Sequence, residues 1–549
     1  MKSNGSKIFF LMIAVIAINF IAANVYERFD LTKDKRYTLS ETTHDIIENI
    51  KEPAIISIYL EGDFPSEFKR LQIETKQHLE ELKAINKNIK FKFIEPLDKA
   101  EDLIKQGLQP SRLSVQEGGK VSEAVIFPWA TIKYNNKIEN VSLLTNQTIG
   151  TQEEQLQNSI QNLEFAFSDA IRKISSEKKL KIAILRGNGE LDDIYLVGFL
   201  RQLGQYYKLA PFTLDSVHKN PQKTIQQLNE YDLTIIAKPT EKFTEKEKFT
   251  LDQYITNGGK SLWLIDNVTA ELDSLMQTGE TLAFNRDLNL TDLLFSYGVR
   301  INYDLVKDIN SATISLASGN TGGQTQYQNF PWHYYPLVVP SSKHPITTNI
   351  DQIRLRFSNT IDTLKNGITK TILLQSSEYS KPSGTPRVIA LDEVAKKPSQ
   401  QDYNNGKQTL GVLLEGEFSS AYANRVKPFE TDLYKDKSTL NKMVIIADGD
   451  VIANEVFQGQ PLELGLDKWT KIRYGNAPFL MNTINYMLDD SGLLQLRSKS
   501  IQLQFLDKQK AFKERTFWQL LNVVLPIIIL TVFGFLYQYL RKRKYGVSS

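Results

Sequence analysis

The sequence contains no cysteine in its 549 residues. This absence excludes disulfide bonds, a thiolate nucleophile, iron–sulfur clusters and zinc sites built on cysteine. It also excludes a lipoprotein anchor, because that anchor is attached to a cysteine side chain. Thiol redox chemistry is excluded in the same way, whatever the folds of the individual domains.

Histidines are also few, and the net charge of the chain is small. The five histidines, at 44, 78, 218, 333 and 344, show no metal-binding spacing, and no Gly-x-Ser-x-Gly motif marks a serine nucleophile. The formal net charge is +3, and the basic run 541–544 alone carries four positive charges. The rest of the chain is therefore close to neutral, which argues against a nucleic-acid partner. The sequence predicts neither catalytic activity nor a cofactor.

Long apolar runs are confined to the two ends of the chain. Residues 517–540 carry no charged side chain and are long enough to cross about 30 Å of hydrocarbon as a helix. Residues 8–25 are apolar and follow Lys2 and Lys7. Their length and the poor cleavage site at 21–23 favour a retained span over a cleaved signal peptide. We therefore predict two transmembrane helices that flank a large soluble body.

Two spans would place both ends of the chain on the same side of the membrane. The tails 1–7 and 541–549 are basic, and a long domain between two spans can cross the membrane regardless of its own charge. We therefore expect cytoplasmic tails and a body outside the cytoplasm. Within the spans, Asn19, Asn24 and Pro526 are candidate contacts with a partner helix, because polar groups in lipid favour such partners.

The body is expected to contain two α/β domains joined by a helix. Residues 30–148 contain a strand–helix–strand unit and short antiparallel strands, and they resemble a thioredoxin-like domain without its CxxC motif. Residues 152–176 form a connector helix with one apolar stripe. Residues 180–506 alternate buried strands with helices, which is typical of a parallel sheet. Within them, 308–329 are rich in Ser, Gly, Thr and Gln and are expected to form loops, and the aromatic segment 332–345 is expected to be irregular.

The turn after the first strand of this sheet is the best candidate ligand-binding site. It consists of Gly187, Asn188, Gly189 and Glu190, at the strand end where parallel sheets place their ligands. Asp266 also follows a buried strand and joins these candidates. The plainer interpretation is a tight turn, in which glycines permit unusual backbone angles and the glutamate favours the start of a helix. Both interpretations stay open.

Two further motifs give weaker signals. Asp448 and Asp450 follow another strand and could join Asp266 in holding Mg²⁺, although ordinary turn residues are the plainer interpretation. The run Gly-Gly-Lys-Ser at 258–261 lacks the earlier glycine of a P-loop, since position 254 is Tyr. Its lysine also enters a predicted strand, so we interpret the glycines as the end of a helix and expect no ATPase activity.

Several motifs occur in the order that is found in a known family. They are RFDLTKDKRYTLSETT (28–43), GNGE (187–190), WHYYPLVVPSSKHPIT (332–347), LLEGEFSSAY (413–422), IADGD (446–450), LDKQK (506–510) and WQLLNVVLPIIIL (518–530). Together they resemble the auxiliary, so-called substrate-binding, subunits of a bacterial ABC-type transport system. The resemblance covers essentially the whole chain and is greatest to the gliding-motility-associated members of the Bacteroidetes.

This resemblance implies a fold, partners and a location. Residues 180–506 would form a glutamine-amidotransferase-like domain of the flavodoxin or Rossmann type, non-catalytic here because the cysteine nucleophile of catalytic relatives is absent. Asn188 stands where relatives often carry histidine, which weakens an acid–base role for the turn. The partners would be a polytopic ABC permease and a cytoplasmic ATPase in the inner membrane, with the body of this chain in the periplasm.

Three functions therefore remain open from the sequence. The first is a non-catalytic subunit of a membrane complex for gliding motility. The second is a solute-binding module that uses the crevice near Gly187–Glu190. The third is a metal-dependent enzyme built on Asp266, Asp448 and Asp450.

Overall fold

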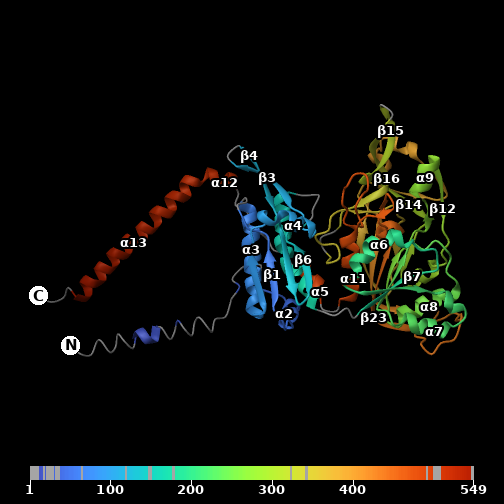
Figure 1. The fold of residues 1–549 in the computed structure, drawn as a ribbon, viewed down its shortest axis with the longest axis horizontal. Helices are drawn as coiled ribbons and strands as arrows, with labels where there is room; N and C mark the ends of the chain where they lie inside the picture. Colours follow the sequence, from blue (N-terminus) through green and yellow to red (C-terminus); the bar gives the residue numbers. More distant parts are fainter. Residues whose placement is uncertain are drawn as a thin grey trace. The chain divides into compact units, whose positions relative to one another are not determined.

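A computed structural model describes most of the chain. The described residues are 11–15, 19, 30, 38–62, 66–117, 120–145, 151–175, 180–321, 324–340, 344–489, 492–498 and 508–545. The chain divides into two compact units, Met1–Ser500 and Ile501–Ser549. Figure 1 labels the elements of both units, which are described separately below.

The first unit begins with a small mixed sheet. Its four strands lie in the order β2-β1-β5-β6, and β1 is parallel to β2 but antiparallel to β5. Its strands are β1 (Ala54–Ile58), β2 (Ile89–Phe93), β5 (Trp129–Tyr134) and β6 (Lys137–Ser142). Helix α3 (Ser66–Ile85) connects β1 to β2, as the predicted strand–helix–strand unit requires. Further helices are α2 (Glu41–Glu48), α4 (Ala100–Lys105) and α5 (Gln152–Ser175).

The antiparallel extension predicted after this unit is only partly right. Strands β5 and β6 pair as expected, and β5 also joins β1 in the main sheet. Strand β4 (Lys120–Ile126) instead pairs with β3 (Ser111–Glu117) in a separate two-stranded hairpin. The connector helix α5 forms close to its predicted bounds and buries one apolar stripe, which includes Leu163 and Phe167.

A seven-stranded sheet forms the centre of the remaining part. Its order is β19-β22-β23-β10-β9-β7-β8. The five strands from β23 to β8 are parallel, and β22 and β19 add an antiparallel edge. The strands are β7 (Lys181–Arg186), β8 (Lys208–Thr213), β9 (Leu233–Ala237), β10 (Lys260–Leu264), β19 (Thr369–Gln375), β22 (Thr409–Ser419) and β23 (Lys437–Ile446).

Helices cover both faces of this sheet, as expected for parallel strands that are apolar on both sides. One face packs against α6 (Asp193–Leu203) and α11 (Asn476–Leu488) through an apolar cluster that includes Phe199 and Leu480. The other face packs against α7 (Pro221–Leu228), α8 (Glu245–Thr256) and α10 (Thr291–Ser296) through a cluster that includes Tyr254 and Trp263. The predicted alternation of buried strands and helices is therefore confirmed.

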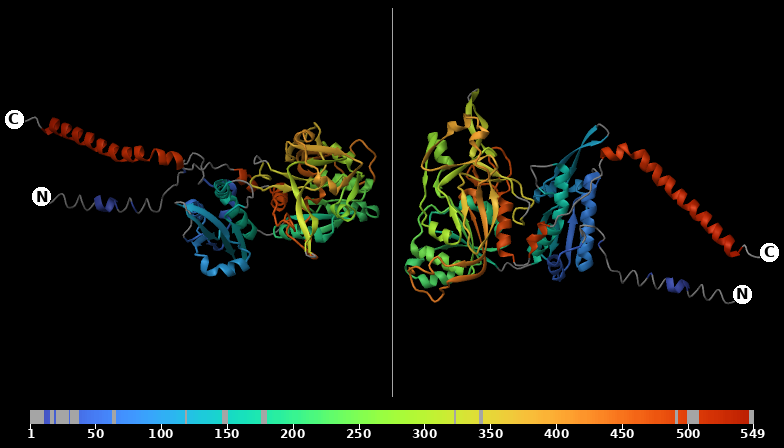
Figure 2. Two further views of the ribbon diagram at one scale, coloured as in Figure 1. Left: turned by 90° about the horizontal axis from the view of Figure 1, so that it is seen from above. Right: turned by 180° about the vertical axis from the view of Figure 1, so that it is seen from behind.

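The segment that the sequence predicts as loop is a long hairpin instead. Strands β15 (Ser311–Thr321) and β16 (Gln324–Val338) pair antiparallel and extend beyond the central sheet, where Figure 2 shows them in yellow. The prediction was wrong because Gly, Ser and Gln do not alternate with apolar residues in the projecting part, which is held by backbone hydrogen bonds between the strands. At the base of the hairpin, Trp332 and Tyr334 enter a third apolar cluster. Residues 332–338 of the aromatic segment are thus strand, whereas 344 and 345 lie in a bend and a turn.

Smaller elements complete this part of the chain. They are α9 (Leu272–Thr278), β11 (Val268–Thr269), β12 (Glu280–Asn285), β13 (Val299–Ile301), β14 (Asp304–Asp308), β17 (Ile353–Arg354), β18 (Ile361–Thr363), β20 (Ser380–Gly384), β21 (Arg387–Ala390), β24 (Val456–Phe457) and β25 (Gln460–Pro461). These strands form small sheets of two or three strands. The final strand predicted at 501–506 lies outside the described residues.

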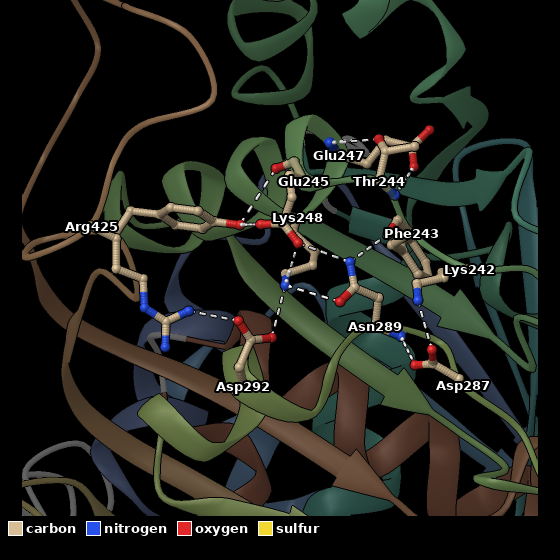
Figure 3. A network of polar contacts seen from close by, with 11 residues as sticks. Lys242, Phe243, Thr244, Glu245, Glu247, Lys248, Asp287, Asn289, Asp292 and Arg425 are labelled. Carbon is tan, nitrogen blue, oxygen red and sulfur yellow. Dashed lines mark hydrogen bonds and ion pairs between the residues drawn. The ribbon is translucent and has the colours of Figure 1, made fainter.

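Helix α8 begins at the capping box that the sequence predicts. The Glu247 amide donates to the Thr244 hydroxyl at 3.3 Å, and the Thr244 amide donates to the Glu247 carboxylate at 2.7 Å. One turn on, the Lys248 ammonium contacts Asp292 of α10 at 2.8 Å, and Arg425 contacts the same carboxylate at 2.6 Å. Figure 3 shows Asp292 between these two bases. The start of α8 is therefore tied to two distant segments.

Helix α8 also ends as predicted. Gly258 follows the helix with φ +103°, a conformation that favours glycine, and Lys260 is the first residue of β10. A P-loop lysine would open a helix, so the structure agrees with our rejection of a P-loop at 258–261.

The second unit contains α12 (Lys508–Lys513) and α13 (Arg515–Tyr545). Among the described residues, the segment Arg515–Lys544 is the one helix long and apolar enough to cross a membrane, with a mean hydropathy of 2.4 over its most apolar window. The predicted first span, 8–25, lies largely outside the described residues, although 11–15 are helical. The second predicted span is thus consistent with the structure, whereas a pair of spans is not shown.

Candidate functional site

A cavity of about 790 Å³ opens where the parallel strands of the central sheet end. Its lining includes Glu190 after β7, Lys238 after β9 and Asp450 after β23. The carboxyl ends of parallel strands are the usual position for ligands in such folds, and the volume lies within the usual range for small-molecule sites. The predicted turn at 187–190 is therefore at the edge of a real cavity.

Lys238 is the central charge of this cavity, and the sequence analysis missed it. Its ammonium contacts the carboxylates of Asp450 at 2.8 Å, Glu271 at 3.0 Å and Asp266 at 3.7 Å. The side chain is buried, and burial alone would lower its pKa. The three carboxylates outweigh that effect and raise the pKa, so that Lys238 stays charged. Its backbone is left-handed, with φ +55°, directly after β9.

The predicted carboxylates Asp266 and Asp448 are buried beneath the cavity. Asp266 accepts a hydrogen bond from the Gly449 amide at 2.6 Å, and Asp448 accepts from the amides of Asp450 and Arg356. Burial raises the pKa of Asp266 to about 6 against the pull of Lys238, and burial together with the Asp266 carboxylate raises that of Asp448 well above its usual range. Both carboxyl groups therefore resist ionisation more than an exposed aspartate does.

Asp450 behaves in the opposite way because it faces the bases. Burial would raise its pKa, but Lys238 and Arg356 outweigh this effect and lower it. Asp266, Asp448 and Asp450 are thus brought together as predicted, with a lysine among them. No group of three or more acidic or histidine side chains suited to a metal ion occurs in the described part of the chain. The magnesium hypothesis is therefore not supported.

A second set of ion pairs forms another part of the lining. Arg354, at the end of β17, contacts Glu455 and Asp467, each at 2.6 Å, and Arg356 contacts the same Glu455 at 2.7 Å. Both guanidinium groups donate to the same oxygen of Glu455, Oε1, through short charge-assisted hydrogen bonds. The alternation Arg-Leu-Arg at 354–356 is the one signal of these bases in the sequence, and their partners stand in no motif.

The predicted turn has the strained geometry that its glycines suggest. Gly187 and Gly189 have φ +111° and +70°, and a Cβ on Gly189 would lie 2.2 Å from the Thr240 hydroxyl. The Asn188 amide donates to one carboxylate oxygen of Glu190 at 2.9 Å. The side chain of Asn188 is buried and reaches toward Glu247 at 3.4 Å, outside the cavity lining. Of the four residues, Gly189 and Glu190 line the cavity.

Glu190 carries an unused hydrogen-bonding atom in this lining. Its second carboxylate oxygen, Oε1, is buried and has no hydrogen-bond partner. Burial raises the pKa of Glu190, although the Arg186 charge and nearby backbone amides act in the opposite direction. A buried carboxylate oxygen without a partner is costly, and Glu190 is the residue of the predicted turn that brings a charged side chain to the cavity lining.

Two exposed aromatic side chains also belong to the cavity. Tyr327 of β16 and Trp469 stack with ring centroids 5.5 Å apart, and each exposes half or more of its surface. Neither residue stands in a recognisable motif, and Tyr327 lies in the segment predicted as loop. An exposed aromatic pair beside a cavity can contact the flat or cationic part of a ligand.

The predicted contacts within the membrane spans are only partly described. The Asn19 amide group donates to the Val15 carbonyl at 2.9 Å, one helical turn earlier, and Asn24 lies outside the described residues. Pro526 lies inside α13 with its side chain unburied. Because proline has no amide hydrogen, it leaves one carbonyl of the preceding turn without its helical donor.

Comparison with known proteins gives a match to one described family. A family model described as an ABC-type uncharacterized transport system matches residues 179–483, more than half of the chain. A domain of unknown function matches residues 33–133. The first match contains the central sheet and the whole lining of the cavity.

Individual relatives add little about activity. An uncharacterized protein of Borreliella burgdorferi is 21% identical over 569 residues, an alignment that covers 99% of this chain and 100% of the relative. The solved mmIFT52 N-terminal domain is 15% identical and covers 56% of this chain and 98% of that chain, with a TM-score of 0.29. A TM-score this low supports no conclusion about the fold.

Proposed function

Because this chain belongs to the family described as an ABC-type uncharacterized transport system, we propose that it is a non-catalytic auxiliary subunit of an ABC transporter complex, anchored in the cytoplasmic membrane. The single observation that carries the anchoring is α13. Its apolar side chains are exposed along the whole helix, for example Leu530 at 70% and Phe535 at 70%. Side chains of this kind require lipid or other membrane helices around them.

The basic tail gives the proposed orientation. Arg541–Lys544 follow the apolar part of α13 directly, and such residues favour the cytoplasmic side. We propose that residues 8–25 form a second span, so that both tails are cytoplasmic and the body is periplasmic. In this arrangement, the body reaches a polytopic permease in the membrane, and the permease in turn binds the cytoplasmic ATPase.

We further propose that both body domains are binding scaffolds. The order β2-β1-β5-β6, with one antiparallel strand, supports a thioredoxin-like domain at 30–148. The five parallel strands with helices on both faces support a glutamine-amidotransferase-like domain at 180–506. Neither can use thiol chemistry, because the chain lacks cysteine.

The subunit role is tested by purification of the full-length protein from its native membrane in mild detergent, with mass spectrometry of the associated proteins. A permease and an ATPase at a fixed ratio are expected. The matched variant lacks 508–549, and we expect it to lose the permease if α13 provides the contact. A full-length protein that purifies alone under every mild condition would contradict the proposal.

An association with gliding motility is proposed from the order of the sequence motifs alone. It predicts that deletion of the gene abolishes surface movement of the native organism without slowing its growth in liquid. Expression of the full-length protein should restore movement. Normal movement of the deletion strain would contradict the association with gliding motility and leave only the role as a transporter subunit.

A second candidate function is favoured by the cavity beside Glu190. We propose that the body also binds a small solute there, because a cavity of about 790 Å³ lies at the strand ends and has the charged side chain of Glu190 in its lining. Thermal stabilisation of the purified protein by a solute, lost on substitution of a lining residue, would support this role.

A further inference from the structure

The charges of the cavity are unevenly paired. Seven carboxylates and four basic side chains line it. Three of the bases, Lys238, Arg354 and Arg356, contact carboxylates at 3.0 Å or less. An anionic ligand would therefore compete with carboxylates that already hold these bases.

The unpaired charges of the lining are mostly negative. Glu190, Asp192 and Asp273 line the cavity, and no ion pair with a base is found for them among the described side chains. The charge of Arg186 acts on Glu190, but its guanidinium donates its hydrogen bonds to Asp193 and to the Leu191 carbonyl. The cavity thus has free acceptors for a cation and few free donors for an anion.

Glu190 is the unpaired acidic residue of the lining whose carboxylate has a fixed position. One of its oxygens is held by the Asn188 amide at 2.9 Å, which fixes the carboxylate, and the other is buried without a partner. A cationic group that approaches the Glu190 carboxylate from the cavity would offset its negative charge. The strained turn, with Gly189 packed against Thr240, keeps the carboxylate at the edge of the cavity.

The aromatic pair favours the same class of ligand. Tyr327 and Trp469 stack on each other in the lining of the same cavity, and aromatic faces attract ammonium and guanidinium groups. The one lining base outside the ion-pair network, Lys468, has its ammonium 5.8 Å from the Trp469 ring. The Trp469 ring therefore already has a lysine ammonium near it, and a ligand cation at this ring would take the place of that ammonium.

We infer that the cavity binds an organic cation with a primary ammonium group, which the Glu190 carboxylate accepts and the Tyr327–Trp469 pair covers. Two sources share this chemistry, a free polyamine and a lysine side chain of a peptide. The inference rests on the solute-binding role proposed above and does not depend on the subunit role.

The test is isothermal titration of the full-length protein in detergent at low salt. The probes are spermidine, trilysine, citrate and maltose. Spermidine represents a free polyamine, and trilysine represents the lysine side chains of a peptide. We expect both to bind, and the probe that binds more tightly indicates which of the two sources supplies the ligand. Citrate and maltose represent anionic and neutral ligands, and we expect no binding of either.

Variants separate the cavity from general electrostatic attraction. Glu190→Gln keeps the shape of the side chain and should weaken cation binding about tenfold or more, since it removes a charged hydrogen bond. Trp469→Ala should also weaken it. The matched control is Glu230→Gln, which removes an exposed carboxylate that contacts Lys181 at 3.2 Å outside the lining, and it should leave binding unchanged.

The outcomes distinguish the binding of an organic cation from the more general solute-binding role. If citrate or maltose binds and the cations do not, the cavity is a solute site but its assignment to a cation is wrong. If cations bind equally well to Glu190→Gln, the assignment is also wrong. If no probe binds, both the assignment and the solute-binding role fail, and the subunit role is unaffected.

Discussion

The ammonium of Lys238 lies 2.8 Å from the Asp450 carboxylate, across 212 residues of sequence. This ion pair joins the residue after β9 to a residue near the end of β23, and β10 lies between those strands in the sheet. Glu271 and Asp266 contact the same ammonium. One buried base therefore holds three chain segments together beneath the cavity.

Replacing Lys238 with methionine should destabilise the protein strongly. The variant would leave Asp450, Glu271 and Asp266 near one another without their shared cation, and breaking a buried ion pair in this way costs about 3–5 kcal/mol. We expect a clearly lower midpoint of thermal unfolding for the full-length protein in detergent.

The control for this prediction is Lys242→Met. Lys242 contacts Asp287 at 2.7 Å, but both side chains are exposed, and surface pairs of this kind contribute little. We expect an almost unchanged midpoint. A double variant, Lys238→Met with Asp450→Asn, should recover part of the loss, whereas no recovery would argue against charge as the cause.

The stability of the protein should depend on pH through Asp266. Burial raises the pKa of this group from 3.8 to about 6 in the folded protein, despite the opposing effect of Lys238. Between these values the folded state binds more protons than the unfolded state, so this group's contribution to stability falls as pH rises. The fall amounts to about 1.4 kcal/mol for each unit of the pKa shift and ends above pH 6.

Asp266→Asn removes this titration and provides the comparison. The midpoint of thermal unfolding should be measured for both proteins from pH 4 to pH 8. The difference, wild type minus variant, should decrease from pH 4 to about pH 6 and then stay constant. A difference that increases over this range would mean that Lys238 lowers the pKa of Asp266 more than burial raises it.

The sequence predicted well those features that depend on residues close together in the chain. The capping box of Thr244 and Glu247 is one case, because both partners lie within one helical turn. The position of Asp266, Asp448 and Asp450 at one edge of the sheet is another, because parallel strands end on the same side. These predictions needed only the local pattern and the strand direction.

The features that the sequence did not reveal depend on distant partners. Arg354 contacts Asp467 across 113 residues, and neither side chain stands in a recognisable motif. The hairpin of β15 and β16 is a different case: apolar residues alternate at 312, 314 and 316, but the polar residues that follow show no such alternation and pair through the backbone. Lys238 left only a weak signal, a lone base directly after a buried strand. Such contacts follow from the topology of the sheet, which the sequence pattern does not specify.

The capping box gives a local prediction. Thr244→Ala removes the acceptor of the Glu247 amide and should cost about 0.5–2 kcal/mol at the start of α8. Hydrogen exchange should then be faster at the first amides of this helix and unchanged at α11. Thr244→Ser keeps the hydroxyl and should exchange like the wild type. Equal exchange in all three proteins would show that the contacts of Lys248 alone hold the helix start.

The absence of cysteine permits a direct test of the proposed orientation. Two single-cysteine variants are needed, Val426→Cys in the body and Lys544→Cys after α13. Val426 is 92% exposed, and Lys544 is the last of four consecutive basic residues, so neither change removes a core contact. In spheroplasts, a membrane-impermeant maleimide should label the cysteine at 426 and should reach the one at 544 only after lysis. The wild-type chain, which has no thiol, is the blank. Labelling of the cysteine at 544 in intact spheroplasts would place the basic tail outside the cytoplasm, and the permease and ATPase would then have to contact the other side of this subunit.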